Sequence, residues 1–391
     1  MEDVFVVRSL RTPFGSFGGA LSDQDAPRLG AIVLQSLLTQ SDLDPDAVDE
    51  VIVGQVLMGG AGQAPARQAM RQAGLPDAVH AMTINKVCGS GLKAVMLAAG
   101  SIRLGDASIV LAGGMESMSR APYAVPGARF GQRMGDGTFV DLLLHDGLRD
   151  PYSGRHMGEL ADLTAERCGL TRELQDEYAI RSFVRAQAAA RDDILKSEIV
   201  PVTKEGKKGS QTVVEDEAPF KADFEKLRAL RPAFRPEGTI TAGNASSIAD
   251  GAALSLLAGE AALKAHALRP AARLVADSTY SLAPERFAEA PAGAIRAACA
   301  RAGLRLDQID LFEINEAFAA VVLIALQELG LDPERVNVHG GAVSLGHPVG
   351  ASGGRLVGAL IGELQRRGLH YGLATLCIGG GEAVAAIFER V

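Results

Sequence analysis

The chain has 391 residues, of which 47% are hydrophobic, so we expect one large domain or two to three ordinary domains with a sizeable core. Its formal net charge of −8 argues against general affinity for nucleic acid or for anionic membranes. The four cysteines are spread over the chain without a CxxC pair, so the sequence predicts neither a metal site nor a disulfide framework.

The first residues, "MEDVFVVRSLRTPFG", are typical of a strand and not of a secretory signal. The apolar run at 317–326 is too short to span a bilayer. We therefore expect a cytoplasmic protein with reduced thiols and no membrane contact.

The first half of the chain predicts strands that alternate with helices. A short buried strand over 51–53 is followed by a helix with apolar residues at helical spacing from Leu92 to Ile102. An apolar strand over 108–112 then ends in glycines. This alternation indicates an α/β fold whose sheets are covered on both faces.

Residues 120–248 have no counterpart in the second half. They combine glycine-rich segments, helical patterns over 159–192 and a hairpin signal at "TKEGKKGSQ" (203–211). We interpret them as an insertion into the first half, which resumes at 249–265. An insertion of this size either covers a substrate or serves structure and oligomerisation.

The second half repeats the first. Three pairs of segments align in the same order: "LDPDAVDEVIVGQVL" (43–57) with "LRLDQIDLFEINEAF" (304–318), "CGSGLKAVMLAAGSI" (88–102) with "GASGGRLVGALIGEL" (350–364), and "LAGGMES" (111–117) with "CIGGGEA" (377–383). Strands are again predicted, over 311–314 and 373–378. The matches indicate a duplicated unit, so we expect two halves related by a pseudo-twofold axis.

Four side chains could carry chemistry. Cys88 precedes a helix start, where free N–H groups and the helix dipole stabilise a thiolate, although many cysteines are only buried filler. Cys377 ends a strand before three glycines, and His347 leads into the helix that matches the Cys88 helix. The symmetry would bring His347 near Cys88, and a Cys–His pair is the usual arrangement for an activated thiol. Asn315, beside Glu316, either caps the next helix or holds a water in an oxyanion hole.

These stretches resemble the thiolase family. "NKVCGSGLKA", "GNASSIADGAA", "INEAFA", "GGAVSLGHPVGASGGR" and "CIGGGEA" match its signatures in order, and the similarity runs from about residue 3 to the C-terminus. The resemblance implies duplicated βαβαβαββ halves packed as five layers, αβαβα, with an inserted loop domain. The expected parts are an N-terminal half (1–119 plus 249–270), the loop domain (120–248) and a C-terminal half (271–391).

The resemblance also implies a mechanism. Cys88 would become acylated, His347 would take its thiol proton, and Cys377 would act as general acid/base. Asn315, through a water, and His347 would form one oxyanion hole, and the backbone N–H groups of Cys88 and Gly379 a second. The implied reaction is the condensation of two acetyl-CoA molecules to acetoacetyl-CoA and coenzyme A, and its reversal, with no cofactor beyond these thioesters.

Within the family the chain is similar to short-chain, biosynthetic-type members. The pair His156 and Met157 matches the stretch that lines their acyl and pantetheine pocket, Ser246 matches a contact to pantetheine, and Phe318 is a further expected pocket residue. The tip of the loop domain would join two dimers into a tetramer.

The chain also departs from the family. Lys221 stands in for an arginine that contacts the nucleotide of coenzyme A, and arginine and lysine are not equivalent at such a site. Lys226 replaces a serine, and Arg155 replaces an aromatic residue. These changes affect the nucleotide contacts and the preferred acyl length.

Three alternatives remain open. The first is a 3-ketoacyl-CoA thiolase with a longer acyl pocket, and the second is a decarboxylating ketoacyl synthase, against which Cys377 and the "GNAS" stretch speak. The third is a non-catalytic carrier, which could have lost Cys88 or His347. Cys168 and Cys299 lie in helical patterns, so we expect them to be structural.

Overall fold

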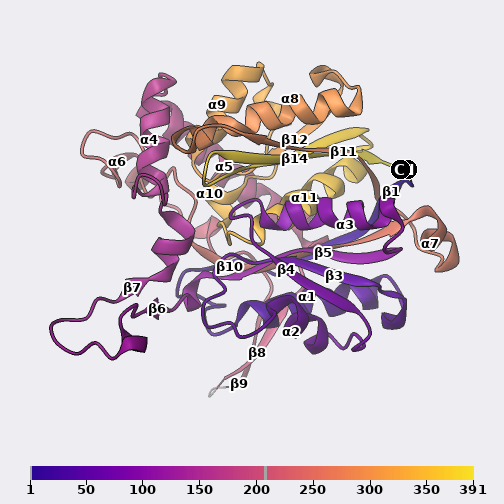
Figure 1. Ribbon diagram of the computed structural model, residues 1–391. Helices are drawn as coiled ribbons and strands as arrows, with labels where there is room; N and C mark the ends of the chain where they lie inside the picture. The colour runs from indigo at the N-terminus through magenta and orange to yellow at the C-terminus, as the bar shows by residue number, and fades with distance from the viewer. Residues whose placement is uncertain (1, 207–208) are drawn as a thin grey trace.

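The structure, a computed structural model, describes residues 2–206 and 209–391. Its two halves stack as five alternating layers of helix and sheet (Figure 1), which confirms the predicted αβαβα order. From one outer face to the other, the helices are α1 (Ala26–Gln40) and α2 (Pro65–Gln72), then α3 (Ser90–Leu104) and α11 (Ser352–Arg367) in the centre, then α8 (Ala290–Ala302) and α9 (Ala319–Leu329).

The two sheets share one strand order, except that β4 has no counterpart strand in the second sheet. The first runs β4-β3-β5-β10-β1, and the second β12-β13-β14-β11. Their strands are β1 (Val4–Arg11), β3 (Glu50–Gly54), β4 (His80–Ile84), β5 (Ile109–Ser117), β10 (Ala249–Gly259), β11 (Ala272–Ser281), β12 (Leu311–Ile314), β13 (Tyr371–Ile378) and β14 (Glu382–Arg390). The strands β1 and β11 meet through only two residue pairs, so the sheets belong to separate layers that touch at one edge. The matching orders confirm the duplication.

The central helices approach each other closely because both begin with glycines. A Cβ atom on Gly91 would lie 2.8 Å from the Gly350 carbonyl oxygen, and one on Gly353 would lie 2.1 Å from the Leu92 nitrogen. Only hydrogen fits at these positions. The N-termini of α3 and α11, with the loops before them, therefore meet between the sheets.

The strand predicted over 108–112 is too short, because β5 continues through its glycines to Ser117. A Cβ atom on Gly114 would lie 1.8 Å from the Gly350 carbonyl oxygen, so these glycines admit the loop before α11 and do not end the strand. The third alignment of the repeat is also wrong in detail. Residues 111–117 form one strand, whereas 377–383 span the end of β13, a turn and the start of β14.

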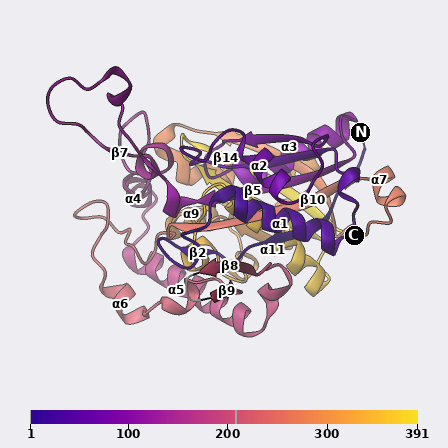
Figure 2. The ribbon, with the colours of Figure 1, turned by 90° about the horizontal axis from the view of Figure 1, so that it is seen from below.

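Much of the insertion lies on the side of the two halves that is opposite the chain termini, in both ribbon views (Figures 1 and 2). Its helices are α4 (Met157–Arg167), α5 (Arg172–Arg191) and α6 (Phe224–Ala229), and β6 (Tyr123–Ala124) pairs with β7 (Val140–Asp141) at the base of an extended arm. The predicted hairpin consists of β8 (Val202–Gly206) and β9 (Gly209–Val213). Its predicted turn residues, Lys207 and Lys208, lie outside the described residues.

Three short elements complete the fold: β2 (Gly15–Ser16), α7 (Glu260–Ala265) and α10 (Ala342–Leu345). The segment Val87–Leu104 is long and apolar enough to cross a membrane by length and composition alone. However, 56% of it is buried, because it forms the central helix α3 between the two sheets. Its hydrophobicity is thus explained by the core.

Candidate active site

A cavity of about 370 Å³ opens where the two halves meet the insertion. Eight of the ten predicted site residues line it: Cys88, His156, Met157, Ser246, Phe318, His347, Cys377 and Gly379. A larger cavity, of about 610 Å³, lies between β1 and α11 and contains none of the predicted residues. Size alone therefore does not identify the site, whereas the convergence of reactive side chains does.

Cys88 lies in a tight turn just before α3. The preceding residue, Val87, has φ +45°, a left-handed conformation that is unfavourable for a β-branched side chain. Local hydrogen bonds maintain it: Asn85 Oδ1 accepts from the Val87 N–H at 2.9 Å, and the Ser90 N–H and hydroxyl both donate to the Val87 carbonyl oxygen. Backbone strain of this kind is common where a reactive side chain must be aimed.

The environment of Cys88 favours the neutral thiol. Burial raises the pKa of Cys88 to about 11, and the nearby Glu116 carboxylate adds a smaller rise. The backbone N–H groups of Gly379 and of Cys88 itself act in the opposite direction, because they approach the sulfur and favour negative charge there. These are the two groups that the sequence predicts as an oxyanion hole.

His347 is held as a neutral base. The Ser352 hydroxyl donates to the Pro348 carbonyl oxygen at 3.0 Å, so its oxygen accepts from His347 Nδ1, and we assign the ring hydrogen to Nδ1. Nε2 then carries a lone pair, 3.4 Å from Asn315 Nδ2. Burial, with a smaller effect from Arg355, lowers the pKa of His347 to about 4.

Asn315 follows β12 and is completely buried. Its backbone N–H donates to the Thr375 carbonyl oxygen at 2.9 Å, and its Oδ1 atom has no partner among the described protein atoms. The capping alternative is wrong, because Phe318 is the N-cap residue of α9 and Asn315 lies three residues earlier. The Asn315 amide instead faces His347.

Cys377 is the penultimate residue of β13 and is 1% exposed. Burial, and then the neighbouring Cys88, raise the pKa of Cys377 well above its ordinary value. Both cysteines line the same cavity, so two protonated thiols lie beside one neutral imidazole. Such a set can exchange protons with a bound molecule at little cost in charge separation.

An aromatic wall forms part of the cavity. The Phe318 ring packs edge-on against Phe234 and Phe287, with ring centroids 6.1 Å and 6.4 Å away. Phe234 also stacks on His156 at 4.7 Å. Phe234 and Phe287 were not predicted from the sequence, because both lie in proline-flanked segments without a periodic pattern ("RPAFRP", "PERFAEAP").

Glu116 is a further residue of the site that was not predicted from the sequence. Its carboxylate is buried and accepts hydrogen bonds from the backbone N–H groups of Val56, Leu57 and Gly350 at 2.9–3.1 Å. It therefore ties the loop that carries His347 to the N-terminal half. Burial raises the pKa of Glu116 to about 7, and the only signal in the sequence was a charged residue within an apolar strand.

The remaining predicted contacts lie outside the cavity. Lys221 pairs with Glu217 at 2.6 Å and does not line the cavity, so its nucleotide contact stays a prediction. Arg155 pairs with Glu159, and Lys226 is largely exposed. Within the part of the chain that the structure describes, no group of three or more His, Cys, Asp or Glu residues could hold a metal ion.

The duplicated α/β fold brings together two thiols, a neutral imidazole and a pair of N–H groups. This set of groups defines a class of enzymes that transfer acyl groups through cysteine. The family model described as "Thiolase, N-terminal domain" matches residues 4–261, and the family model described as "Thiolase, C-terminal domain" matches residues 268–390. The chain belongs to the thiolase family.

Several relatives match this chain along their whole length. The chain is 50% identical to an acetyl-CoA acetyltransferase of Pseudomonas aeruginosa over 392 residues, covering 100% of both proteins. It is 47% identical to a probable acetyl-CoA acetyltransferase of Escherichia coli, again over 100% of both. The crystal structure of the Bacillus anthracis acetyl-CoA acetyltransferase superposes with a TM-score of 0.98 at 42% identity, covering 100% of this chain and 99% of the other.

Proposed function

We propose that this protein is an acetyl-CoA acetyltransferase, which condenses two acetyl-CoA molecules to acetoacetyl-CoA and coenzyme A and catalyses the reverse thiolysis. The observation that carries this proposal is the convergence of Cys88, His347 and Cys377 on one cavity of about 370 Å³. The full-length similarity to proteins of that name supports it.

In the first half-reaction, Cys88 sulfur attacks the thioester carbon of acetyl-CoA while its proton moves to His347 Nε2. The N–H groups of Cys88 and Gly379, which approach the Cys88 sulfur, would donate to the developing oxyanion. Coenzyme A leaves as a thiolate and takes the proton of Cys377. The products are acetyl-Cys88, imidazolium, the Cys377 thiolate and free coenzyme A.

In the second half-reaction, the Cys377 thiolate removes a proton from the methyl group of a second acetyl-CoA. The enolate oxygen is stabilised by the His347 imidazolium and by a water held at Asn315, whose Oδ1 atom is free to accept from it. The carbanion attacks acetyl-Cys88, acetoacetyl-CoA forms, and the leaving Cys88 thiolate recovers its proton from His347. Both thiols and the imidazole return to their resting forms.

The aromatic wall favours short acyl groups. Phe318 packs against both Phe234 and Phe287, and Phe287 is only 2% exposed, so extension of the cavity on this side would require large side chains to move. Thiolysis of acetoacetyl-CoA, 3-ketohexanoyl-CoA and a longer 3-ketoacyl-CoA tests this directly. We expect kcat/KM to be highest for acetoacetyl-CoA, and equal or higher values on the longer substrates would instead support the β-oxidation alternative.

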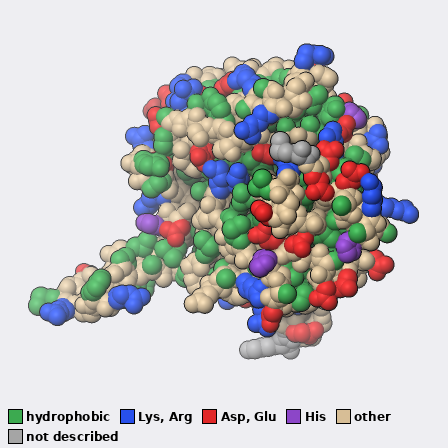
Figure 3. Space-filling view, turned by 45° about the vertical axis from the view of Figure 1, so that its right-hand side comes forward, with side chains coloured by type: hydrophobic (Ala, Val, Ile, Leu, Met, Phe, Trp, Pro, Cys, Tyr) green, Lys and Arg blue, Asp and Glu red, His purple; other side chains and the backbone are tan. Residues whose placement is uncertain are grey.

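We further propose a dimer of dimers as the working form. The arm formed by residues 125–139 stands clear of the body (Figure 3). It carries three strongly exposed hydrophobic residues, Phe130, Met134 and Phe139. Exposed apolar side chains of this kind mark an interaction site. All four cysteines are free, which suits the reducing cytoplasm that we propose as the location.

A further inference from the structure

Glu316 is fully buried next to Asn315, and four donors surround its carboxylate. Oε1 accepts from the Tyr178 hydroxyl at 2.7 Å and from Asn337 Nδ2 at 3.1 Å. Oε2 accepts from the Ser182 hydroxyl at 2.7 Å and from the Val343 backbone N–H at 3.0 Å. Among the described residues no lysine or arginine forms an ion pair with it, so neutral donors hold the carboxylate in place.

These contacts join the two segments that carry the predicted enolate-binding pair. Glu316 directly follows Asn315, whereas Val343 lies in α10, four residues before His347. Because one carboxylate spans both segments, a change in its contacts would alter the position of Asn315 relative to His347. Tyr178 and Ser182 come from α5, so the insertion also contributes to this support.

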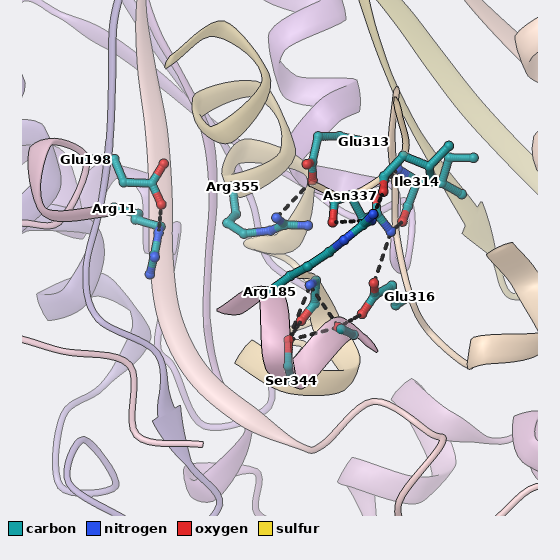
Figure 4. Close-up of polar contacts among 12 residues, drawn as sticks. Arg11, Arg185, Glu198, Glu313, Ile314, Glu316, Asn337, Ser344 and Arg355 are labelled. Atoms are coloured by element: carbon teal, nitrogen blue, oxygen red, sulfur yellow. Dashed lines mark hydrogen bonds and ion pairs between the residues drawn. The ribbon is translucent and has the colours of Figure 1, made fainter. Parts of the chain in front are cut away.

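Asn337 lies between Glu316 and Ile314 and holds the end of β12 as well (Figure 4). Its Oδ1 accepts from the Ile314 N–H, and its Nδ2 donates to the Ile314 carbonyl oxygen, both at 2.8 Å. In the N-terminal half, β4 pairs with β3 along five residues, whereas here only a single bridge joins Phe312 to Val336. The side-chain amide of Asn337 therefore replaces a missing strand partner immediately before Asn315.

The conformation of this segment is specific to its residues. Asn337 has φ +49°, a left-handed conformation that asparagine tolerates better than most residues. Arg185 of α5 holds the segment by donating to the Val336 carbonyl oxygen at 2.7 Å. Both the insertion and the backbone geometry thus direct the Asn337 amide toward β12.

We propose that Glu316 and Asn337 are positioning residues that hold the Asn315 amide against His347 Nε2 and thereby serve the enolate-forming half-reaction. The inference rests on the proposed function, in which this pair stabilises the enolate. His347 is held by contacts outside this network. Its ring binds the Ser352 hydroxyl, and its backbone N–H donates to the Ser247 carbonyl oxygen at 2.9 Å. The N–H donors around Cys88 also lie outside the Glu316–Asn337 network, so acetylation of Cys88 should depend on this network much less than condensation does.

The test compares the two half-reactions in Glu316→Gln. In either orientation the new NH₂ group faces an N–H donor, that of Val343 or of Asn337, so the network cannot be restored by a flip. We expect kcat for condensation to fall by roughly tenfold to a hundredfold, with exchange of labelled coenzyme A into acetyl-CoA within about threefold of wild type. Asn337→Ala should show the same split, and the double variant should lose less than the product of the two effects.

Two further variants make the outcome decisive. Ile295→Ala removes a buried side chain from the core cluster that includes Tyr178 and serves as a control for lost stability without a change in the network. Equal losses in both half-reactions for Glu316→Gln, as for a merely destabilised protein, would overturn the inference. The variant Asn315→Ala distinguishes a failure of the positioning inference from a failure of the proposed role of Asn315. If it blocks condensation while Glu316→Gln does not, only the positioning inference fails, and if it condenses normally, the proposed role of Asn315 fails with it.

Discussion

At the scale of single residues, the site is set up by burial and not by ion pairs. Burial raises the pKa of Cys88 to about 11 and lowers the pKa of His347 to about 4, so both groups are neutral near pH 7. In the proposed mechanism the thiol proton therefore moves during attack on the thioester, and no resting thiolate–imidazolium pair forms. This arrangement protects the nucleophile from side reactions until a substrate is bound.

A first prediction concerns the reactivity of this thiol. The rate of alkylation of Cys88 by iodoacetamide should keep rising with pH beyond the value of about 8.5 that is typical of free cysteine, because burial shifts thiolate formation upward. Peptide mass spectrometry of the Cys88 peptide measures that rate separately from the other cysteines. A plateau near neutral pH would show a preformed thiolate and contradict this electrostatic account.

A second prediction separates the roles of the two active-site cysteines. Cys377→Ser should lose condensation by roughly a hundredfold or more, since a serine hydroxyl is a far weaker acid than a thiol and does not supply the base for the methyl proton. Exchange of coenzyme A into acetyl-CoA should be retained, because coenzyme A leaves as a thiolate and can take its proton from water in place of Cys377. The two assays on one preparation provide the check, with Cys299→Ala as the control because Cys299 packs in a separate core cluster. Condensation near the wild-type rate would assign the acid/base role to another residue.

At the scale of elements, the close approach of α3 and α11 brings the catalytic loops together. Cys88 and His347 were predictable because each lies in a local glycine-rich pattern and the internal repeat relates the two patterns. Glu116, Phe234 and Asn337 were not predictable, because their roles depend on backbone groups and rings that are distant in sequence. For the same reason the length of β5 was misjudged, since its glycines make room for a loop more than two hundred residues away.

A third prediction belongs to the aromatic wall. Phe287→Ala should raise kcat/KM for 3-ketohexanoyl-CoA relative to acetoacetyl-CoA, because it removes a buried ring that lines the cavity. It should also cost about 3 kcal/mol or more of folding free energy. Phe388→Ala, in a different core cluster, is a control for that loss. An unchanged substrate ratio would mean that other residues limit the acyl length.

At the scale of the whole molecule, duplication explains how one cavity receives groups from distant parts of the chain. Each half supplies one central helix, one cysteine comes from each half, and the insertion adds His156 and Met157. The insertion also supplies the exposed arm, on which Phe130 is 86% and Met134 95% exposed. Such side chains are costly to leave in water, which supports the proposed contact between dimers at the arm.

A fourth prediction follows for assembly. Replacing Phe130, Met134 and Phe139 together by serine should halve the molar mass measured by light scattering, because the proposed contact between dimers loses its apolar surface. Circular dichroism and the melting temperature should remain close to wild type, since the arm lies outside the core. An unchanged mass would place the contact between dimers elsewhere.

The most direct test of the central claim is to identify the residue that carries the acetyl group. The protein is incubated with acetyl-CoA alone, quenched in acid and digested, and its cysteine peptides are analysed by mass spectrometry. We predict acetylation of Cys88 in the wild type, stoichiometric acetylation in Cys377→Ser, and none at any cysteine in Cys88→Ala. An acetyl group on another residue, or stoichiometric acetylation of the Cys88→Ala variant, would contradict the account.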